Sequence, residues 1–244
     1  GGFLNLDREG HVIVYLDRAS GGLPSDGGLS VFTGRDGVVW LGMQKGMAKI
    51  ETPSAFSRFG ESAGLTGFVN DMVRHRGVLY AATMQGIFYL DAKKGRFERV
   101  AGMPKAATNS VFSLLSVGDR LLAPGFSSGI FEVSVSGMKQ VAPRPENSGV
   151  LFVMYQSTFD PSLIYVGCDN MLVSYRLAPS GRITFERKIA DTPAIRSIVE
   201  SAAGTVWLGL ESQGVMRVRT KGQQVEVKQF GTAEIMDRHV GAIQ

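Results

Sequence analysis

Cysteine is almost absent from this sequence: Cys168 is the only one among 244 residues. No disulfide can form within the chain, and no group of thiolates can bind a metal ion. We expect Cys168 to be a small buried apolar side chain at a strand end, because no histidine stands near it to activate the thiol. The three histidines, His11, His75 and His239, are too widely separated for metal-ligand spacing, and we expect them to face solvent on turns and strand ends. The sequence therefore predicts neither a metal site nor a cofactor.

Long hydrophobic runs and charge of a single sign are also missing. No segment approaches the roughly 18 consecutive apolar residues of a membrane-spanning helix, and the longest apolar runs, 12–16 and 150–155, are strand-sized. The formal net charge is +4, and the basic residues are scattered singly, unlike the basic stripe of a nucleic-acid-binding surface. The chain begins with Gly1-Gly2 and stops at Gln244 without a signal peptide or a terminating pattern. We therefore expect a piece of a longer protein that has no nucleic-acid partner and meets a membrane only through segments outside this sequence.

Glycine, in contrast, is abundant. The sequence has 31 glycines against nine prolines, and no stretch has the periodicity of a long amphipathic helix. Such a composition favours many short strands joined by tight turns, and hence an all-β fold.

An internal repeat makes this prediction more specific. The segments 22–51 and 192–219 share one order of features: an apolar strand, a glycine turn, the letters V-W-L-G, and then a further strand opened by glycine. The residues that open this further strand are Gly2, Gly46, Gly86, Gly129, Met171 and Gly214, at successive spacings of 44, 40, 43, 42 and 43 residues. A period of this length is typical of a β-propeller, in which each repeat is a blade of four antiparallel strands.

The repeat predicts a single propeller domain over 1–244. Its five complete copies cover 22–61, 62–101, 102–143, 144–190 and 191–230. In the first copy the strands are expected at 29–33, 38–42, 47–51 and 56–59. In the later copies the first two strands are expected near 69–74 and 78–83, 111–116 and 120–123, 151–156 and 163–167, and 195–200 and 205–209. The strands expected within 1–17 and 235–244 would form a partial sixth blade shared by the two ends of the chain. Alternatively, part of the ring lies outside this sequence.

A large side chain recurs near the end of the second strand of each copy. Trp40, Tyr80, Tyr165 and Trp207 occupy this position, and Leu122 replaces the ring in the third copy. Because a large ring buries an area of about 150–250 Å², we interpret these aromatic residues as wedges that pack each blade on its neighbour. The sequence therefore predicts that all four rings are buried.

Two copies resemble a known family of repeats. The first contains Gly22-Leu23-Pro24, Ser30, Asp36-Gly37 and Trp40-Leu41-Gly42, and the fifth contains Ile195, Ser197-Ile198, Gly204 and Trp207-Leu208-Gly209. These motifs resemble the two-component regulator propeller repeats of the extracytoplasmic sensor regions of bacterial histidine kinases, hybrid two-component proteins and some diguanylate cyclases. The resemblance implies a β-propeller in a periplasmic or extracytoplasmic location, within a signal-transduction protein whose full-length form is a homodimer.

The loops between second and third strands carry the candidate ligand-binding residues. These are Gln44, Lys45, Gln85, Phe126, Asn170 and Gln213, to which we add Asp71 because serine stands at its place in three other copies. Amides, a cation and an aromatic ring suit a polar small molecule such as an oligosaccharide, or a protein partner. The first hypothesis for the function of this chain is thus a non-catalytic ligand-sensing or protein-interaction module.

Two other classes of protein remain open at this stage. A propeller lyase or hydrolase, acting on a small or carbohydrate substrate, would need acid, base or metal-binding groups that converge on the channel, and the sequence offers only Asp71 and scattered candidates. A sialidase-type box would need an acid two residues before the turn glycine, where Arg35 and Ala202 stand. An assembly scaffold without a small ligand is the third class. We expect no catalytic residues.

Overall fold

The computed structural model describes residues 2–6, 9–19, 22–25, 27–33, 38–51, 59–102, 110–125 and 128–231. Within these ranges the regular structure is β-strand apart from one 3-10 turn, η1 (Glu61–Ala63), so the predicted all-β class is confirmed. The chain divides into two compact units, Gly1–Ser62 and Ala63–Gln244.

The unit Gly1–Ser62 contains the first copy of the repeat. It consists of a two-stranded sheet of β1 (Phe3–Leu6) and β2 (Val12–Leu16), and a three-stranded sheet of β3 (Gly28–Thr33), β4 (Val38–Met43) and β5 (Met47–Glu51). Its core is formed by Leu23, Val39, Leu41, Met43 and Ile50. The predicted fourth strand at 56–59 falls almost entirely outside the described residues, and the closing strand expected at 235–244 falls wholly outside them.

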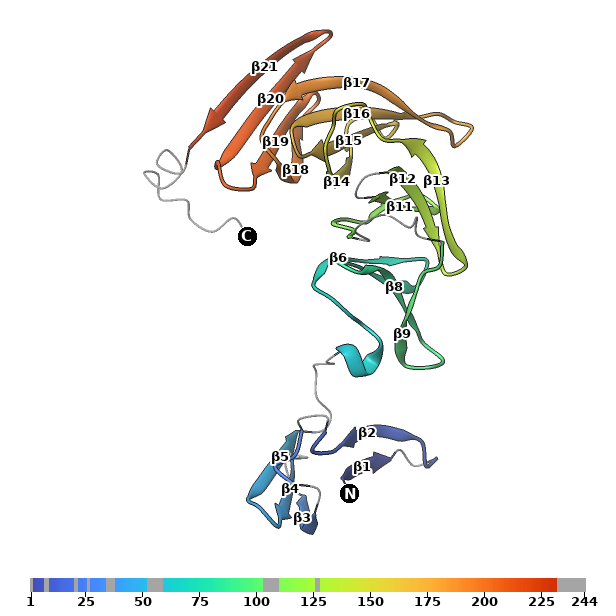
Figure 1. Cartoon of the computed structure of the whole chain (residues 1–244), viewed down its shortest axis with the longest axis vertical. Helices are drawn as coiled ribbons and strands as arrows, with labels where there is room; N and C mark the ends of the chain where they lie inside the picture. Colours follow the sequence, from blue (N-terminus) through green and yellow to red (C-terminus); the bar gives the residue numbers. More distant parts are fainter. Residues whose placement is uncertain are drawn as a thin grey trace. The chain divides into compact units, whose positions relative to one another are not determined.

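The unit Ala63–Gln244 contains copies two to five, each folded as a four-stranded antiparallel sheet in the order 1-2-3-4. The second blade has β6 (Val69–His75), β7 (Val78–Thr83), β8 (Gly86–Asp91) and β9 (Arg96–Arg99); the third has β10 (Leu115–Val117), β11 (Arg120–Gly125), β12 (Gly129–Ser134) and β13 (Gly137–Pro143); the fourth has β14 (Leu151–Gln156), β15 (Leu163–Cys168), β16 (Met171–Leu177) and β17 (Ile183–Asp191); the fifth has β18 (Ile195–Ala202), β19 (Thr205–Leu210), β20 (Val215–Lys221) and β21 (Gln224–Phe230). Figure 1 shows these sheets following one another in chain order. The predicted propeller blades are therefore confirmed.

The hydrophobic core of this unit lies in the seams between blades. One cluster joins Leu122 and Ile130 of the third blade to Leu151 and Met154 of the fourth. A second cluster joins Tyr165 of the fourth blade to the fifth, and another joins Tyr80 of the second blade to the third. Each of these blades thus buries apolar side chains against its neighbours, as expected of a repeat array. The second blade also has a cluster of its own, Ala81, Phe88 and Phe97, against which Leu65 packs.

The four aromatic wedges do not share one environment. Tyr80 and Tyr165 are 4% and 3% exposed, because the next blade covers each ring. Trp207 is only partly buried, and the residues that follow its blade, 232–244, lie outside the described part of the chain. Trp40 is 37% exposed, so its predicted burial is wrong within the unit Gly1–Ser62. The physical reason is common to both tryptophans: a wedge faces the following blade, and the described residues of their own unit contain none.

A β-bulge recurs near the start of the first strand. The register of pairing with the second strand shifts at Asn70, Phe152 and Arg196, and at Leu29 in the first copy. The third copy differs from the prediction, because β10 begins at Leu115 rather than near Val111. There the backbone N–H groups of Val111 and Leu114 bond to Thr83 and Asp71 of the preceding blade instead of to β11.

The glycine of the W-L-G motif is explained by close approach to the first strand. A Cβ added at Gly209 would lie 2.2 Å from the Oγ of Ser197, and one added at Gly42 would lie 2.5 Å from the Oγ of Ser30. The serine and the glycine are opposite each other in the ladder in both copies. The serine and the glycine therefore pack against each other in the same way in both copies of the motif.

Replacing Gly209 with alanine is expected to lower the free energy of unfolding by up to about 1 kcal/mol, because the exposed Ser197 hydroxyl must rotate away from the new methyl group. The double variant Gly209→Ala, Ser197→Gly should recover part of this loss, since the second change removes the clashing hydroxymethyl group. Urea denaturation of both variants measures the coupling. Independent, additive effects of the two substitutions would contradict the proposed contact.

Polar side chains also connect successive blades at a fixed place in the repeat. His75 of the second blade accepts a hydrogen bond at Nδ1 from Ser116 (2.8 Å) and donates from Nε2 to the Asp119 carbonyl (3.1 Å). Two blades further on, Ser157 donates to the buried carboxylate of Glu200 at 2.7 Å. Ser116 and Glu200 occupy equivalent positions at the end of their first strands, as do His75 and Ser157 one residue later. Each pair therefore bridges one seam in the same way.

Candidate functional site

The loops between second and third strands define one face of the unit Ala63–Gln244, which we call the loop face. The same backbone hydrogen bond supports three of these loops: Met84 N–H to Phe68 O, Asp169 N–H to Val150 O, and Glu211 N–H to Ala194 O, at 2.9–3.0 Å. Each bond joins the first residue of the loop to the residue that precedes the first strand. A constant backbone scaffold thus presents loops that differ in side chains.

The structure brings three of the predicted ligand-binding residues onto the loop face. Gln85, Asn170 and Gln213 are all exposed there. The amide of Asn170 donates to the Asn147 carbonyl at 2.8 Å, and the backbone carbonyl of Gln213 accepts from Gln229 at 3.1 Å. Both contacts hold the loops in place and leave their outer surface open to solvent.

The other predicted residues are placed differently. Gln44 and Lys45 are exposed in the unit Gly1–Ser62, so the structure does not join them to the loop face of the second unit. Phe126 lies outside the described residues. Asp71 is half-buried at the bulge of β6, where Oδ2 accepts the N–H of Leu114 at 2.7 Å and Oδ1 accepts the N–H of Met72 at 2.8 Å. Its carboxylate therefore fixes the seam between the second and third blades.

A row of side chains that sequence reasoning missed lies next to the loop face. We call it the bulge row: Asn70, Phe112, Phe152 and Arg196, which stand at equivalent positions in four successive blades. The rings of Phe112 and Phe152 meet edge to face with centroids 4.9 Å apart. The guanidinium carbon of Arg196 lies 3.7 Å from the centroid of Phe152 and 5.4 Å from that of Phe112. Side chains of the third, fourth and fifth blades thus pack into one layer, in which the Phe152 ring is buried beneath the exposed guanidinium of Arg196.

The bulge row supplies a positioned cation. Arg196 donates from Nη2 to Glu211, the first residue of the β19–β20 loop. The two side chains are 36% and 55% exposed, so the pair is solvated and contributes roughly 0–1 kcal/mol to stability. A guanidinium carries five N–H donors in a planar fork, so this contact leaves donors for a second acceptor. The arrangement suits a ligand with a carboxylate or several hydroxyl groups.

A weak signal for the bulge row was present in the sequence. Inward-facing residues of a regular strand recur every second position, but the buried pairs Leu151 and Met154, and Ile195 and Ile198, are spaced by three. A spacing of three within a strand indicates an inserted residue, and hence a bulge that re-aims a side chain. The contacts between blades could not be read in this way, because they depend on how the blades pack.

The other side chains that could take part in catalysis or metal binding have mainly structural roles. Cys168 is buried as predicted, and burial raises the pKa of its thiol to about 12, which disfavours the nucleophilic thiolate. His75 is 8% exposed, rather than solvent-facing as its sequence context indicated, because the third blade covers it. The part of the chain that the structure describes contains no cluster of three or more metal-ligating side chains.

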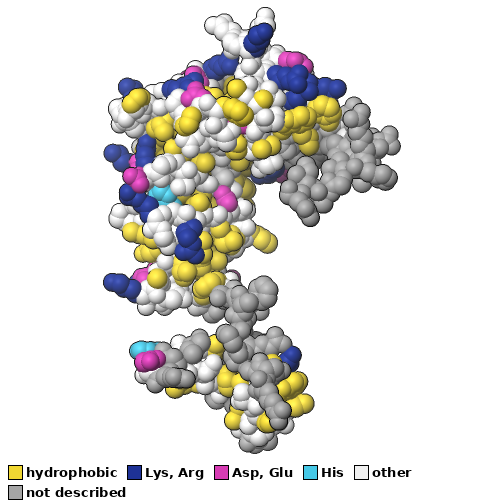
Figure 2. Space-filling view, turned by 180° about the vertical axis from the view of Figure 1, so that it is seen from behind, with side chains coloured by type: hydrophobic (Ala, Val, Ile, Leu, Met, Phe, Trp, Pro, Cys, Tyr) yellow, Lys and Arg dark blue, Asp and Glu magenta, His cyan; other side chains and the backbone are white. Residues whose placement is uncertain are grey.

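Charged groups are interspersed over the surface. Figure 2 shows basic side chains at several separate places on the unit Ala63–Gln244, with acidic side chains beside some of them. Within the described ranges, no helix is long and apolar enough to cross a membrane.

Comparison with known proteins supports the architecture. No protein-family model and no curated protein sequence matches the chain. Among solved structures, the chain is similar to the extracellular domain of a B. thetaiotaomicron protein described as a one-component system, with a TM-score of 0.57, 14% identity, and coverage of 87% of this chain and 32% of that one. It is similar to the extracellular domain of a hybrid two-component system from the same organism, with a TM-score of 0.53, 19% identity, and coverage of 86% and 29%.

An enzyme has the same fold. The chain is similar to a catalytically inactive virginiamycin B lyase from Staphylococcus aureus with quinupristin, with a TM-score of 0.51, 16% identity, and coverage of 94% of this chain and 77% of the lyase. The chain spans about a third of the length of the sensor structures that it matches. At these identities the likeness establishes the fold, a β-propeller array shared by sensor domains and lyases, and the fold alone does not assign an activity.

Proposed function

We propose that this chain is the ligand-sensing or partner-binding propeller of an extracytoplasmic bacterial signalling protein, and that it binds at the loop face without chemical turnover. The observation that carries the proposal is the bulge row, in which Arg196 and two phenylalanines from different blades meet beside the variable loops. The similarity to extracellular domains of one- and two-component systems adds support.

The physical argument concerns where binding energy would be transmitted. Phe112, Phe152 and Arg196 belong to three consecutive blades, so a ligand that binds the exposed Arg196 also acts on the two rings packed against its guanidinium. Binding that depends on the relative position of the blades favours one arrangement of the array over others. A sensor needs such a differential interaction to pass a signal to the rest of its protein.

Substitution of Arg196 tests this site. Arg196→Met is expected to weaken binding of an acidic or polar ligand by about tenfold or more, because a hydrogen bond to a charged group contributes roughly 1.5–3 kcal/mol. Arg217→Met is the matched control, since Arg217 also pairs with a carboxylate, Glu226, and lies near an aromatic ring, Trp207, in the same blade. A thermal-shift screen with neutral and acidic oligosaccharides and with periplasmic extract identifies ligands, and calorimetry measures the variants. If both substitutions weaken binding equally, the bulge row is not part of the binding site.

The competing function is that of a propeller lyase or hydrolase. The similarity to virginiamycin B lyase is the reason to consider it. Product analysis of each stabilising compound separates the two functions. Recovery of the compound unchanged after prolonged incubation supports a sensor, whereas a cleaved or isomerised product would make the chain an enzyme. An assembly scaffold would give stabilisation by a protein from the extract and by none of the small molecules.

A further inference from the structure

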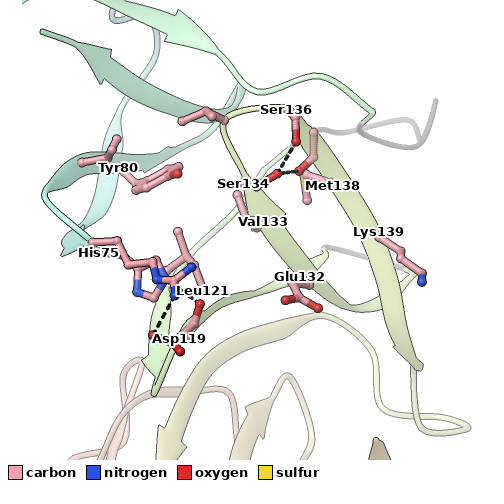
Figure 3. Close-up of a pocket in the computed structure, with 14 residues that line it drawn as sticks. His75, Tyr80, Asp119, Leu121, Glu132, Val133, Ser134, Ser136, Met138 and Lys139 are labelled. Carbon is pink, nitrogen blue, oxygen red and sulfur yellow. Dashed lines mark hydrogen bonds and ion pairs between the residues drawn. The ribbon is translucent and has the colours of Figure 1, made fainter. Parts of the chain in front are cut away.

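A cavity lies away from the loop face. It has a volume of about 570 Å³ and opens at the seam between the second and third blades, beside the turns that join first to second and third to fourth strands. We call it the seam pocket; its lining includes His75, Arg76, Tyr80, Val133, Ser134 and Lys139. Figure 3 shows the Tyr80 ring extending from the second blade toward Val133 and Ser134 of the third. Cavities that bind small molecules commonly have volumes of about 300–1,000 Å³.

The floor of the seam pocket is apolar. Val78, Leu121, Val133 and Met138 line it together with the ring of Tyr80. Leu121 and Val133 are almost fully buried, so the core fixes their positions. A flat or branched apolar group would therefore find a rigid surface.

The mouth of the seam pocket carries one uncompensated cation. Arg76 pairs with Asp119 at 3.0 Å, and Glu132 pairs with Arg120 at 3.0 Å. Lys139 also lines the pocket and has no ionic partner among the described residues. Apart from His75, the lining has two cations and two anions. Arg120, which lies outside the lining, pairs with Glu132, so Lys139, opposite Glu132 in the ladder, is the lining cation that forms no ion pair with the described residues.

Two further features indicate that the mouth is a built site. Arg76 has a φ of +48° in the β6–β7 turn, a left-handed conformation that favours glycine, asparagine or aspartate. The chain thus holds an arginine at the mouth where turn chemistry alone would select a smaller residue. In addition, the Tyr80 hydroxyl can donate a hydrogen bond, because a phenol is protonated in neutral solution and burial raises its pKa further.

We propose that the seam pocket binds a small amphipathic carboxylate, with an apolar body the size of an aromatic ring against Leu121 and Val133 and with the carboxylate beside Lys139. Such a ligand matches the apolar floor and the unpaired cation of the same cavity. The seam between the fourth and fifth blades provides an internal comparison: its cavity is smaller, about 350 Å³, and the Tyr165 hydroxyl within it is directed to Glu200. A ligand at the seam between the second and third blades would act separately from one at the loop face.

The test uses three probes that share one ring and differ in charge: phenylacetate, phenylacetamide and phenethylamine. The methyl group of Met138 lines the pocket and reports binding by carbon-13 NMR of methyl-labelled methionine, while Met216, buried in the fifth blade, is the internal control. We expect saturable shifts of Met138 alone, with a dissociation constant for phenylacetate in roughly the millimolar range. Affinity for the amide should be about fivefold lower or weaker still, and the amine should not bind.

Variants at one register position test the role of the cation. Lys139→Met should reduce phenylacetate binding to the level of the amide. Arg187→Met is the matched control, because Arg187 stands opposite Ser174 in the fourth blade as Lys139 stands opposite Glu132 in the third, and it lines the other cavity. Both side chains are on outer strands, so the fold should persist in each variant. Absence of a Met138 shift up to about 20 mM probe, equal binding of all three probes, or unchanged binding by Lys139→Met would overturn the proposal.

Discussion

Replacing Tyr175 with alanine is expected to lower the free energy of unfolding by about 3–5 kcal/mol, the usual cost of deleting a large aromatic side chain from a core. Tyr175 is fully buried in the cluster that joins the third and fourth blades. Its ring meets Phe185 edge to face with centroids 5.7 Å apart, and its hydroxyl donates to the carbonyl of Pro143 at 2.9 Å. Urea denaturation followed by circular dichroism measures the change.

Two further substitutions divide this loss into its parts. Tyr175→Phe removes only the hydroxyl and leaves the Pro143 carbonyl without this donor, so it should cost about 1–3 kcal/mol. Phe185→Ala truncates the exposed partner of the ring pair, which is 44% exposed, and should cost less than Tyr175→Ala. A loss below about 1 kcal/mol for Tyr175→Ala would show that the seam tolerates a cavity, against the close packing described above.

The second large effect is expected at Glu200, which is 8% exposed in the seam between the fourth and fifth blades. Its Oε2 accepts hydrogen bonds from the Ser157 hydroxyl at 2.7 Å and from the Thr158 N–H at 3.0 Å, and its Oε1 lies 3.5 Å from the Tyr165 hydroxyl. Glu200→Ala leaves these donors without their acceptor inside a seam. We expect the free energy of unfolding to fall by about 2–4 kcal/mol.

The carboxylate of Glu211 provides the control for this prediction. Glu211 is in the same blade and also accepts a hydrogen bond, from Arg196, but its side chain is 55% exposed. Glu211→Ala should change stability by less than about 1 kcal/mol. Glu200→Gln keeps an acceptor in the seam and should fall between the two alanine variants. Equal losses for Glu200→Ala and Glu211→Ala would show that the buried network does not hold the seam.

The strands of this protein could be predicted from the sequence because their signals are local. Val78–Thr83 and Leu151–Gln156 begin and end where alternation and the glycine turns predicted. The start of the third blade could not be predicted, because Asp71, a residue of another blade, takes the Leu114 N–H away from the expected ladder. The exposure of Trp40 was missed for a similar reason: burial of a wedge depends on the blade that follows it, which a motif in one repeat does not describe.

The same distinction between local signals and contacts between blades applies to the candidate site. Exposure of Gln85, Asn170 and Gln213 follows from their place between strands, and the sequence predicted their position. The stacking of Arg196 on Phe152 joins residues 44 apart in the sequence and depends on a bulge in each of two strands. The seam pocket is more remote still from sequence reasoning, because its walls belong to two blades and its volume is what their packing leaves unfilled.

The polar bridges between blades bear on how such a protein can change during evolution. Tandem repeats gain and lose units by unequal recombination. Such a change would leave stability unaffected if every blade could pack equally well against every other blade. Loss of the fourth blade from this chain would bring Glu200 against Val117, the residue at the position of Ser157 in the third blade. Val117 has no side-chain donor, so the buried carboxylate would lose the hydrogen bond that Ser157 supplies, at a cost of about 1–3 kcal/mol. The order of the blades in the gene is therefore constrained by chemistry at each seam, and a deletion that preserves the reading frame and the fold class would still need a compensating substitution at Glu200.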